Sequence, residues 1–372
     1  MIRTDARRGL SSSLGLRVAL SLLLVMGIAV GCSGDDDAPA PGERASERSQ
    51  DDGGPGDPAA TDEEPERTEA PFAVGRQDLV LVDPERPTDA VEALELGRED
   101  ERTVELSVFY PAQGDPGDRA EVLTEWDHSG SLPVESVAEV DAAPAEGPFP
   151  LLVFAHGFIG QGSSFVALAE QWAREGYVVA LPTFPLSRMG VGVADDYVNQ
   201  PGDISFVIDR LTAPDESAEV PAELADGLVD GDRIAVGGHS LGAATVFRAA
   251  YNDCCVDDRV RATVAVSGGP MDAGEGGYDD QPDVPMLLVH GAADPVVDVA
   301  IGDAMVDFVQ APVTYLRFDS GDHVSVFVAD EGQLFSDAVL AFLDAHLRDD
   351  PSELDELPGA VGSSGLAELR TG

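Results

Sequence analysis

The sequence predicts an α/β fold built around a mostly parallel sheet. Between residues 72 and 348, short apolar runs alternate with amphipathic stretches, which is the pattern of repeated strand–helix units. Several of these runs consist largely of Val, Leu, Ile and Phe, as strands buried on both faces require. Because 43% of the 372 residues are hydrophobic and only 25% are charged, the chain can form a sizeable core.

The elements can be placed in chain order from this alternation. Eight strands are expected at residues 79–82, 104–110, 151–155, 178–181, 234–237, 262–267, 286–290 and 314–318. Helical patterns fit between or after them at residues 163–174, 204–211, 241–251, 301–309 and 331–347. This order predicts an eight-stranded sheet with helices on both faces, in a domain that spans residues 71–348.

Both ends of the chain differ in composition from this domain. Residues 1–31 carry arginines and then an uncharged apolar run of secretory length, which indicates a signal peptide. The ending Ala29-Val30-Gly31-Cys32 resembles a bacterial lipobox, which implies a lipid on Cys32 and a cell-envelope lipoprotein. An ordinary secretory signal, giving a secreted protein, is the alternative. Residues 32–70 are expected to form a disordered acidic tether, and residues 349–372 a flexible tail.

The charge balance narrows the range of partners. The chain has 70 acidic residues against 22 basic ones, all of which are arginine, and a formal net charge of −48. Such a field repels phosphates, so neither nucleic acid nor an anionic membrane surface is expected as a partner. Contact with a membrane is expected only through the N-terminal lipid anchor. We expect a monomer.

A candidate nucleophile lies where a predicted strand meets a predicted helix. Residues 234–237 lead into Gly238-His239-Ser240-Leu241-Gly242, which is followed by small and apolar helix residues. This is the G-x-S-x-G pattern of a nucleophile elbow, in the strand–turn–helix context that the motif requires. Glycines are expected on both sides because a side chain there would collide with neighbouring backbone. Ser240 should therefore present its hydroxyl at the top of the sheet and at a helix N-terminus.

A serine nucleophile needs a histidine base, and the histidine needs a carboxylate to orient it. His323 follows the strand at 314–318, where the base should fall in the chain order Ser, Asp, His. Asp294 lies just past the C-terminal end of the strand at 286–290 and is the favoured acid. Its rivals are weaker, since one suits a helix cap and another adjoins the histidine too closely; they are Asp272, Asp298 and Asp322.

An oxyanion hole requires two backbone N–H groups aimed at the developing charge. One is expected from Leu241, the residue directly after the nucleophile, and the other from Phe158, in the loop after the strand at 151–155. His156 begins the same loop, where its side chain is expected to buttress the loop without transferring protons. The adjacent Cys254 and Cys255 form either a vicinal disulfide or two thiols.

Taken together, these residues resemble the α/β-hydrolase superfamily over residues 72–348. The runs at 149–158, 201–211 and 238–242 are similar to a branch of serine esterases, which includes bacterial platelet-activating-factor acetylhydrolase-like, chlorophyllase-like and cutinase-like hydrolases. The resemblance implies the α/β-hydrolase fold, a triad of Ser240, Asp294 and His323, and oxyanion donors at Leu241 and Phe158. It implies no cofactor and no metal.

The implied activity is hydrolysis of carboxylic esters through an acyl-enzyme intermediate. A lipase, phospholipid acyl hydrolase or cutinase-like polyesterase is the alternative, and a non-catalytic surface lipoprotein that uses the fold for binding is the second. The segment 270–283 is short and rich in Gly and Asp, so no large cap domain is expected. An open site would bind a neutral ester, with Phe184, Leu186 and Met189 as candidate substrate-binding residues, although these three could equally be packing residues.

Overall fold

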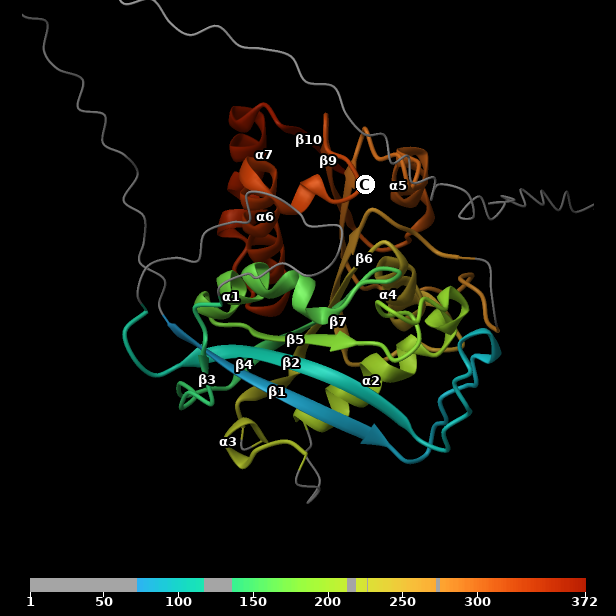
Figure 1. Ribbon diagram of the computed structural model, residues 1–372. Coiled ribbons are helices and arrows are strands. Elements are labelled where there is room, and N and C mark those ends of the chain that lie inside the picture. Colours follow the sequence, from blue (N-terminus) through green and yellow to red (C-terminus); the bar gives the residue numbers. More distant parts are fainter. Residues whose placement is uncertain (1–71, 117–135, 213–218, 226, 272–274) are drawn as a thin grey trace, which may run out of the picture. The chain divides into compact units, whose positions relative to one another are not determined.

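The computed structural model describes residues 72–116, 136–212, 219–225, 227–271 and 275–372 (Figure 1). The predicted signal peptide, the lipidation site at Cys32 and the acidic tether lie outside the described residues. Within the described ranges, no helix has both the length and the apolar character needed to cross a membrane.

A single sheet of ten strands organises the described chain, in the order β10-β9-β8-β7-β6-β4-β5-β2-β1-β3. The six strands from β5 through β4 and β6 to β9 pair in parallel, whereas β1 with β2, β2 with β5, and β9 with β10 are antiparallel. The strands are β1 (Ala73–Asp83), β2 (Arg102–Ala112), β3 (Glu139–Val140), β4 (Phe149–Ala155), β5 (Val178–Thr183), β6 (Val229–His239), β7 (Val260–Val266), β8 (Met286–Gly291), β9 (Val313–Phe318) and β10 (Ala367–Thr371). The prediction of a mostly parallel sheet is confirmed, with all eight expected strands present and β3 and β10 added.

Helices cover both faces of this sheet, as predicted (Figure 1). The α-helices are α1 (Val166–Arg174), α2 (Gln200–Thr212), α3 (Ala222–Ala225), α4 (Leu241–Tyr251), α5 (Val299–Phe308), α6 (Ala329–Leu347) and α7 (Ser352–Ser364). Short 3-10 helices are η1 (Glu92–Leu94), η2 (Gly162–Phe165), η3 (Ala194–Val198) and η4 (Ser325–Phe327).

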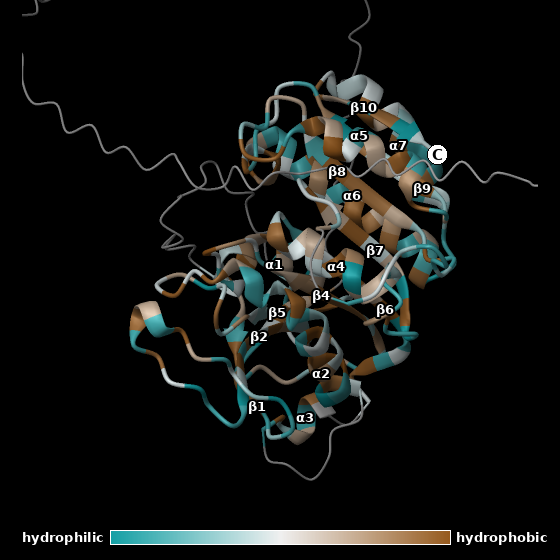
Figure 2. Ribbon diagram, turned by 90° about the vertical axis from the view of Figure 1, so that its right-hand side faces the viewer, coloured by the Kyte–Doolittle hydropathy of each residue, from teal (hydrophilic) through white to brown (hydrophobic). Residues whose placement is uncertain are grey.

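Two hydrophobic cores separate along the pleat of the strands. In β4, Leu151 and Val153 pack into the core shared with α2, α4 and α5, whereas Leu152 and Phe154 pack into the core shared with α1, α6 and α7. This alternation follows from the two-residue period of a strand, and both faces are apolar because both are covered. Figure 2 shows hydrophobic residues concentrated along the central strands.

The prediction of a flexible tail over residues 349–372 is wrong. Leu357 and Val361 of α7 are buried in the core shared with α6, and β10 pairs with β9 from Ala367↔Phe318 to Thr371↔Thr314. The composition of the segment is polar, but its apolar residues recur at helical spacing and so bury one face. The chain after α6 therefore completes one edge of the sheet.

Candidate active site

The nucleophile elbow lies between β6 and α4. Strand β6 ends at His239 and α4 begins at Leu241, so Ser240 alone forms the turn, with φ 56° and ψ −115°. A non-glycine residue with positive φ is strained and persists only where its surroundings hold it. Here the Ser240 N–H donates to the carbonyl of Val266 at 2.9 Å, and the Ser240 carbonyl accepts from the Ala243 N–H at 3.0 Å.

Gly238 and Gly242, which flank the elbow, are needed because any side chain there would collide with neighbouring backbone, as the sequence suggested. A Cβ added at Gly238 would lie 2.4 Å from the carbonyl oxygen of Gly242. One added at Gly242 would lie 2.3 Å from the carbonyl oxygen of Ala155 on β4. Both distances are far below van der Waals contact with rigid backbone. The end of β6 can therefore approach α4, and α4 can approach β4, this closely only without side chains at these two positions.

The predicted acid and base lie in direct contact. The Nδ1–H of His323 donates to Oδ2 of Asp294 at 2.7 Å, and Oδ1 of Asp294 accepts from the backbone N–H groups of Val296 at 2.8 Å and Val297 at 2.9 Å. Burial alone would raise the pKa of Asp294, but hydrogen bonds from His290, His323 and Val297 outweigh it and hold this pKa well below its ordinary value. Asp294 is thus a fixed carboxylate.

The rivals of Asp294 have other tasks or lie outside the described chain. Asp298 caps α5 by accepting a hydrogen bond from the Ala300 N–H at 2.9 Å. Asp322 accepts from the N–H groups of Val324 and Ser325 in its own turn. Asp272 lies among residues that the structure does not describe.

Two strand-end histidines brace the acid and base, and sequence reasoning missed both. His239, next to the nucleophile, donates its Nε2–H to the backbone carbonyl of His323 at 2.8 Å, and their ring centroids are 4.6 Å apart. His290 donates its Nε2–H to the carbonyl of Val297 at 2.9 Å, and the same nitrogen lies 3.4 Å from Oδ2 of Asp294. His239 thereby links the elbow to the loop that carries His323, and His290 links the end of β8 to the loop that carries Asp294.

His156 supports the loop that carries Phe158, as expected from the sequence. Its Nδ1–H donates to the carbonyl of Gly157 at 2.7 Å, and its Nε2 accepts from the backbone N–H of Phe184 at 3.0 Å. Because Nε2 is an acceptor, the ring must be neutral. Burial lowers the pKa of His156 to about 4, in agreement with this role.

Acid is expected to destabilise the fold through these neutral histidines. Burial lowers the pKa of His156 to about 4 and, with the nearby His323, that of His239 to about 3. As the pH falls below the ordinary value of 6.5, the unfolded chain takes up these protons first, so the free energy of unfolding decreases by up to about 1.4 kcal/mol per pH unit for each histidine. Urea titrations between pH 7 and pH 5.5 measure this slope above the range of ordinary carboxylates. His156→Asn should show a shallower slope, and an unchanged slope would contradict the assignment.

The two predicted oxyanion donors come from different parts of the chain. Leu241 opens α4, while the Phe158 loop lies against the elbow, since a Cβ added at Gly157 would lie 3.1 Å from Cβ of Ser240. In the described part of the chain, the backbone N–H groups of Leu241 and Phe158 donate to no protein acceptor, whereas that of the next residue, Ile159, donates to the carbonyl of Ser187 at 2.7 Å. Both N–H groups are thus available to a ligand.

The candidate substrate-binding residues divide into two groups. Phe184 belongs to the core shared with α2, α4 and α5 and is 0% exposed, and Leu186 is 5% exposed. Both are packing residues, so their assignment to substrate binding is corrected: a substrate cannot reach them without rearrangement. Met189 is 37% exposed, and its role in binding stays a prediction. A small apolar cluster around the oxyanion donors was missed by the sequence reasoning; it consists of Phe158, Tyr197, Val198, Leu241, Ala244 and Met271.

Comparisons with known proteins agree with this geometry. Residues 213–325, which include Ser240, Asp294 and His323, match a family model described as phospholipase/carboxylesterase. Among solved structures, the chain is similar to a ferulic acid esterase from Streptomyces cinnamoneus, with a TM-score of 0.55 and 22% identity over 76% of this chain and 92% of that chain. No curated protein sequence matches the chain significantly.

The sheet order, the elbow and these comparisons together show the α/β-hydrolase fold. Across the candidate site, the family match supports a carboxylic ester hydrolase with this fold.

Proposed function

We propose that the protein cleaves carboxylic esters through an acyl-enzyme intermediate on Ser240, with His323 as general base and Asp294 as the orienting carboxylate. The observation that carries the proposal is the 2.7 Å hydrogen bond between His323 Nδ1 and Asp294 Oδ2, beside a strained serine elbow. Because this bond commits the ring proton to Nδ1, Nε2 is the nitrogen left to accept a proton from serine.

The reaction then runs in two acyl transfers. His323 takes the hydroxyl proton of Ser240 as Oγ attacks the ester carbonyl, and the N–H groups of Leu241 and Phe158 hold the oxyanion. When the tetrahedral intermediate collapses, His323 gives the proton to the departing alcohol and the acyl group stays on Ser240. Water attacks this acyl-enzyme with His323 again as base, and the acid leaves.

A covalent intermediate can be detected directly. With p-nitrophenyl acetate in excess, we expect a burst of p-nitrophenol that approaches one equivalent of enzyme. A fluorophosphonate probe should label the protein, and mass spectrometry of the digest should place the adduct on Ser240. Absence of both the burst and the adduct would contradict the acyl-enzyme mechanism and favour the alternative of a binding protein.

The substrate class is proposed to be a neutral ester. A net charge of −48 disfavours anionic substrates, and near the Phe158 loop the apolar side chains of Ile159 and Met189 are exposed. Such a surface also suits the alternatives, a lipase or a polyesterase. A panel of p-nitrophenyl esters of increasing chain length, a feruloyl ester, a phospholipid and a polyester film distinguishes these substrate classes. Export as a lipoprotein anchored through Cys32 stays a proposal.

A further inference from the structure

The two oxyanion donors belong to different elements, so something must fix their spacing. Leu241 is the first residue of α4, whereas Phe158 lies in the loop after β4. An oxyanion hole works only if both N–H groups are already placed when charge develops, and an error of about 1 Å in such a site costs about 100-fold in rate. Any side chain that ties the two elements together therefore affects catalysis.

Gln200 is such a tie. It is the first residue of α2, and it is fully buried. On one side, its Oε1 accepts a hydrogen bond from the hydroxyl of Thr245 at 2.5 Å. Thr245 lies one helical turn after Leu241, and its Oγ1 is also 3.1 Å from the carbonyl oxygen of Leu241. This arm reaches the N-terminal turn of the nucleophile helix.

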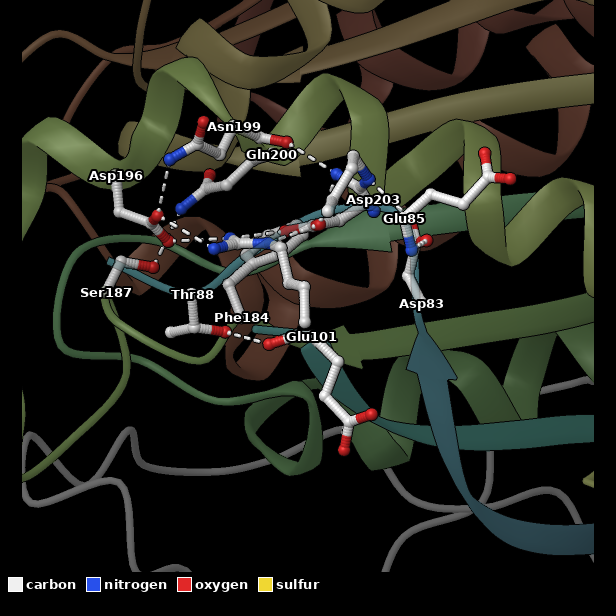
Figure 3. A network of polar contacts seen from close by, with 12 residues as sticks. Asp83, Glu85, Thr88, Glu101, Phe184, Ser187, Asp196, Asn199, Gln200 and Asp203 are labelled. Carbon is white, nitrogen blue, oxygen red and sulfur yellow. Dashed lines mark hydrogen bonds and ion pairs between the residues drawn. The ribbon is translucent and has the colours of Figure 1, made fainter. Parts of the chain in front are cut away.

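The other arm of Gln200 reaches the Phe158 loop. Its Nε2 donates to the hydroxyl of Ser187 at 2.8 Å, and the carbonyl of Ser187 accepts from the backbone N–H of Ile159, the residue after Phe158, at 2.7 Å. The N–H of Met189 donates to the carbonyl of Gly160 at 3.2 Å, which adds a second bond between the same two loops. Figure 3 shows Ser187 and Gln200 turned toward each other.

The backbone on either side of Gln200 is itself held by a buried ion cluster (Figure 3). Arg102, 1% exposed, forms two hydrogen bonds with Asp196, at 3.1 and 2.8 Å, and two with Asp203, at 2.6 and 2.7 Å. Asn199 adds a hydrogen bond to Asp196 at 3.0 Å. Since these carboxylates lie four residues before and three residues after Gln200, Arg102 fixes the point from which the amide reaches both arms.

We propose that Gln200 is a positioning residue that sets the spacing between the Leu241 and Phe158 N–H groups, with Thr245 and Ser187 as its two contacts. This inference rests on the proposed function, since it assumes that these two N–H groups stabilise an oxyanion. Gln200 touches no reacting atom. Its effect should therefore appear in the stabilisation of the tetrahedral state and leave the binding of the ester in its ground state almost unchanged.

The test uses substitutions that remove contacts with little change in volume. Thr245→Val removes only the hydrogen bond to Gln200, whereas Gln200→Met removes the bonds to both Thr245 and Ser187. Thr245→Ser is the matched control that keeps the hydroxyl. For the first two we expect kcat to fall about 10- to 100-fold with KM changed less than about threefold, and the affinity for an alkyl boronic acid, which forms a tetrahedral adduct on serine, to fall in parallel. Affinity for the carboxylic acid product should stay the same, and Thr245→Ser should resemble the wild type.

Two outcomes would overturn the proposal. One is a folded Thr245→Val protein whose kcat and boronic acid affinity lie within about twofold of the wild type. The other is a loss confined to the melting temperature and KM, which a merely structural role predicts. If Gln200→Met does not fold, Ser187→Ala tests the other arm with the same readouts. A wild-type protein with neither a burst nor a fluorophosphonate adduct would instead count against the proposed function, which separates the two failures.

Discussion

Replacing Ser240 by alanine should abolish ester turnover, with kcat falling by about 10⁶-fold and KM changing little. The expected size follows from serine hydrolases in general, where loss of the nucleophile leaves only the modest catalysis that the oxyanion hole and substrate binding supply. Alanine fits the positive φ of the turn no worse than serine does, and no protein group described in the structure bonds to the Ser240 hydroxyl. The melting temperature should therefore stay within a few degrees of the wild type.

The neighbouring strand offers a matched control for this variant. Ser267 follows β7, also has positive φ (50°), is fully buried, and has no hydrogen-bond partner for its hydroxyl in the described chain. Ser267→Ala removes the same atom from a similar backbone, so it should retain both turnover and fluorophosphonate labelling. Turnover by Ser240→Ala above about 1% of the wild type, after purification from contaminating esterases, would rule out Ser240 as the nucleophile.

The residues predicted as acid, base and elbow could be found from the sequence because their positions follow from local rules. Asp294 and His323 each follow a strand that ends at the same edge of a parallel sheet, which brings residues far apart in the chain together. The supporting contacts have no such rule. His239 meets the carbonyl of His323 across 84 residues, and Gln200 meets Thr245 across 45, so only the packed structure shows them.

The fold was predictable where hydrophobic pattern and position agreed. All eight expected strands carry buried apolar residues, which in β1 alternate with more exposed ones, whereas the five residues of β10 include none that is buried. The C-terminal segment is ordered because α7 packs against the core. Its Leu354, Leu357 and Val361 recur at helical spacing in a stretch otherwise rich in Asp, Glu, Pro, Gly and Ser. The composition of the segment suggested disorder, whereas the spacing of its apolar residues indicates a helix with one buried face.

Asp294→Asn should lower kcat/KM by about 10⁴-fold although it changes only one atom. The asparagine carbonyl can keep the two backbone bonds to Val296 and Val297 that Oδ1 of Asp294 accepts, and this directs the amide NH₂ toward His323. An N–H donor facing Nδ1 forces the ring proton onto Nε2, the nitrogen that has to accept the proton of Ser240. The base is then present in the wrong tautomer. Steady-state kinetics across pH 6–9 measures the loss.

Asp298→Asn is the control for charge and sequence position, because Asp298 caps α5 and asparagine caps helices about as well. It should leave kcat/KM and stability nearly unchanged, and similar losses in both variants would contradict the assignment of Asp294.

The stability of Asp294→Asn provides a second readout, since the pKa of Asp294 is lowered in the folded chain. Its carboxylate therefore stabilises the fold above the ordinary carboxyl pKa, and this contribution is lost as the pH falls. The difference in free energy of unfolding between Asp294→Asn and the wild type should thus be largest at neutral pH and shrink in acid.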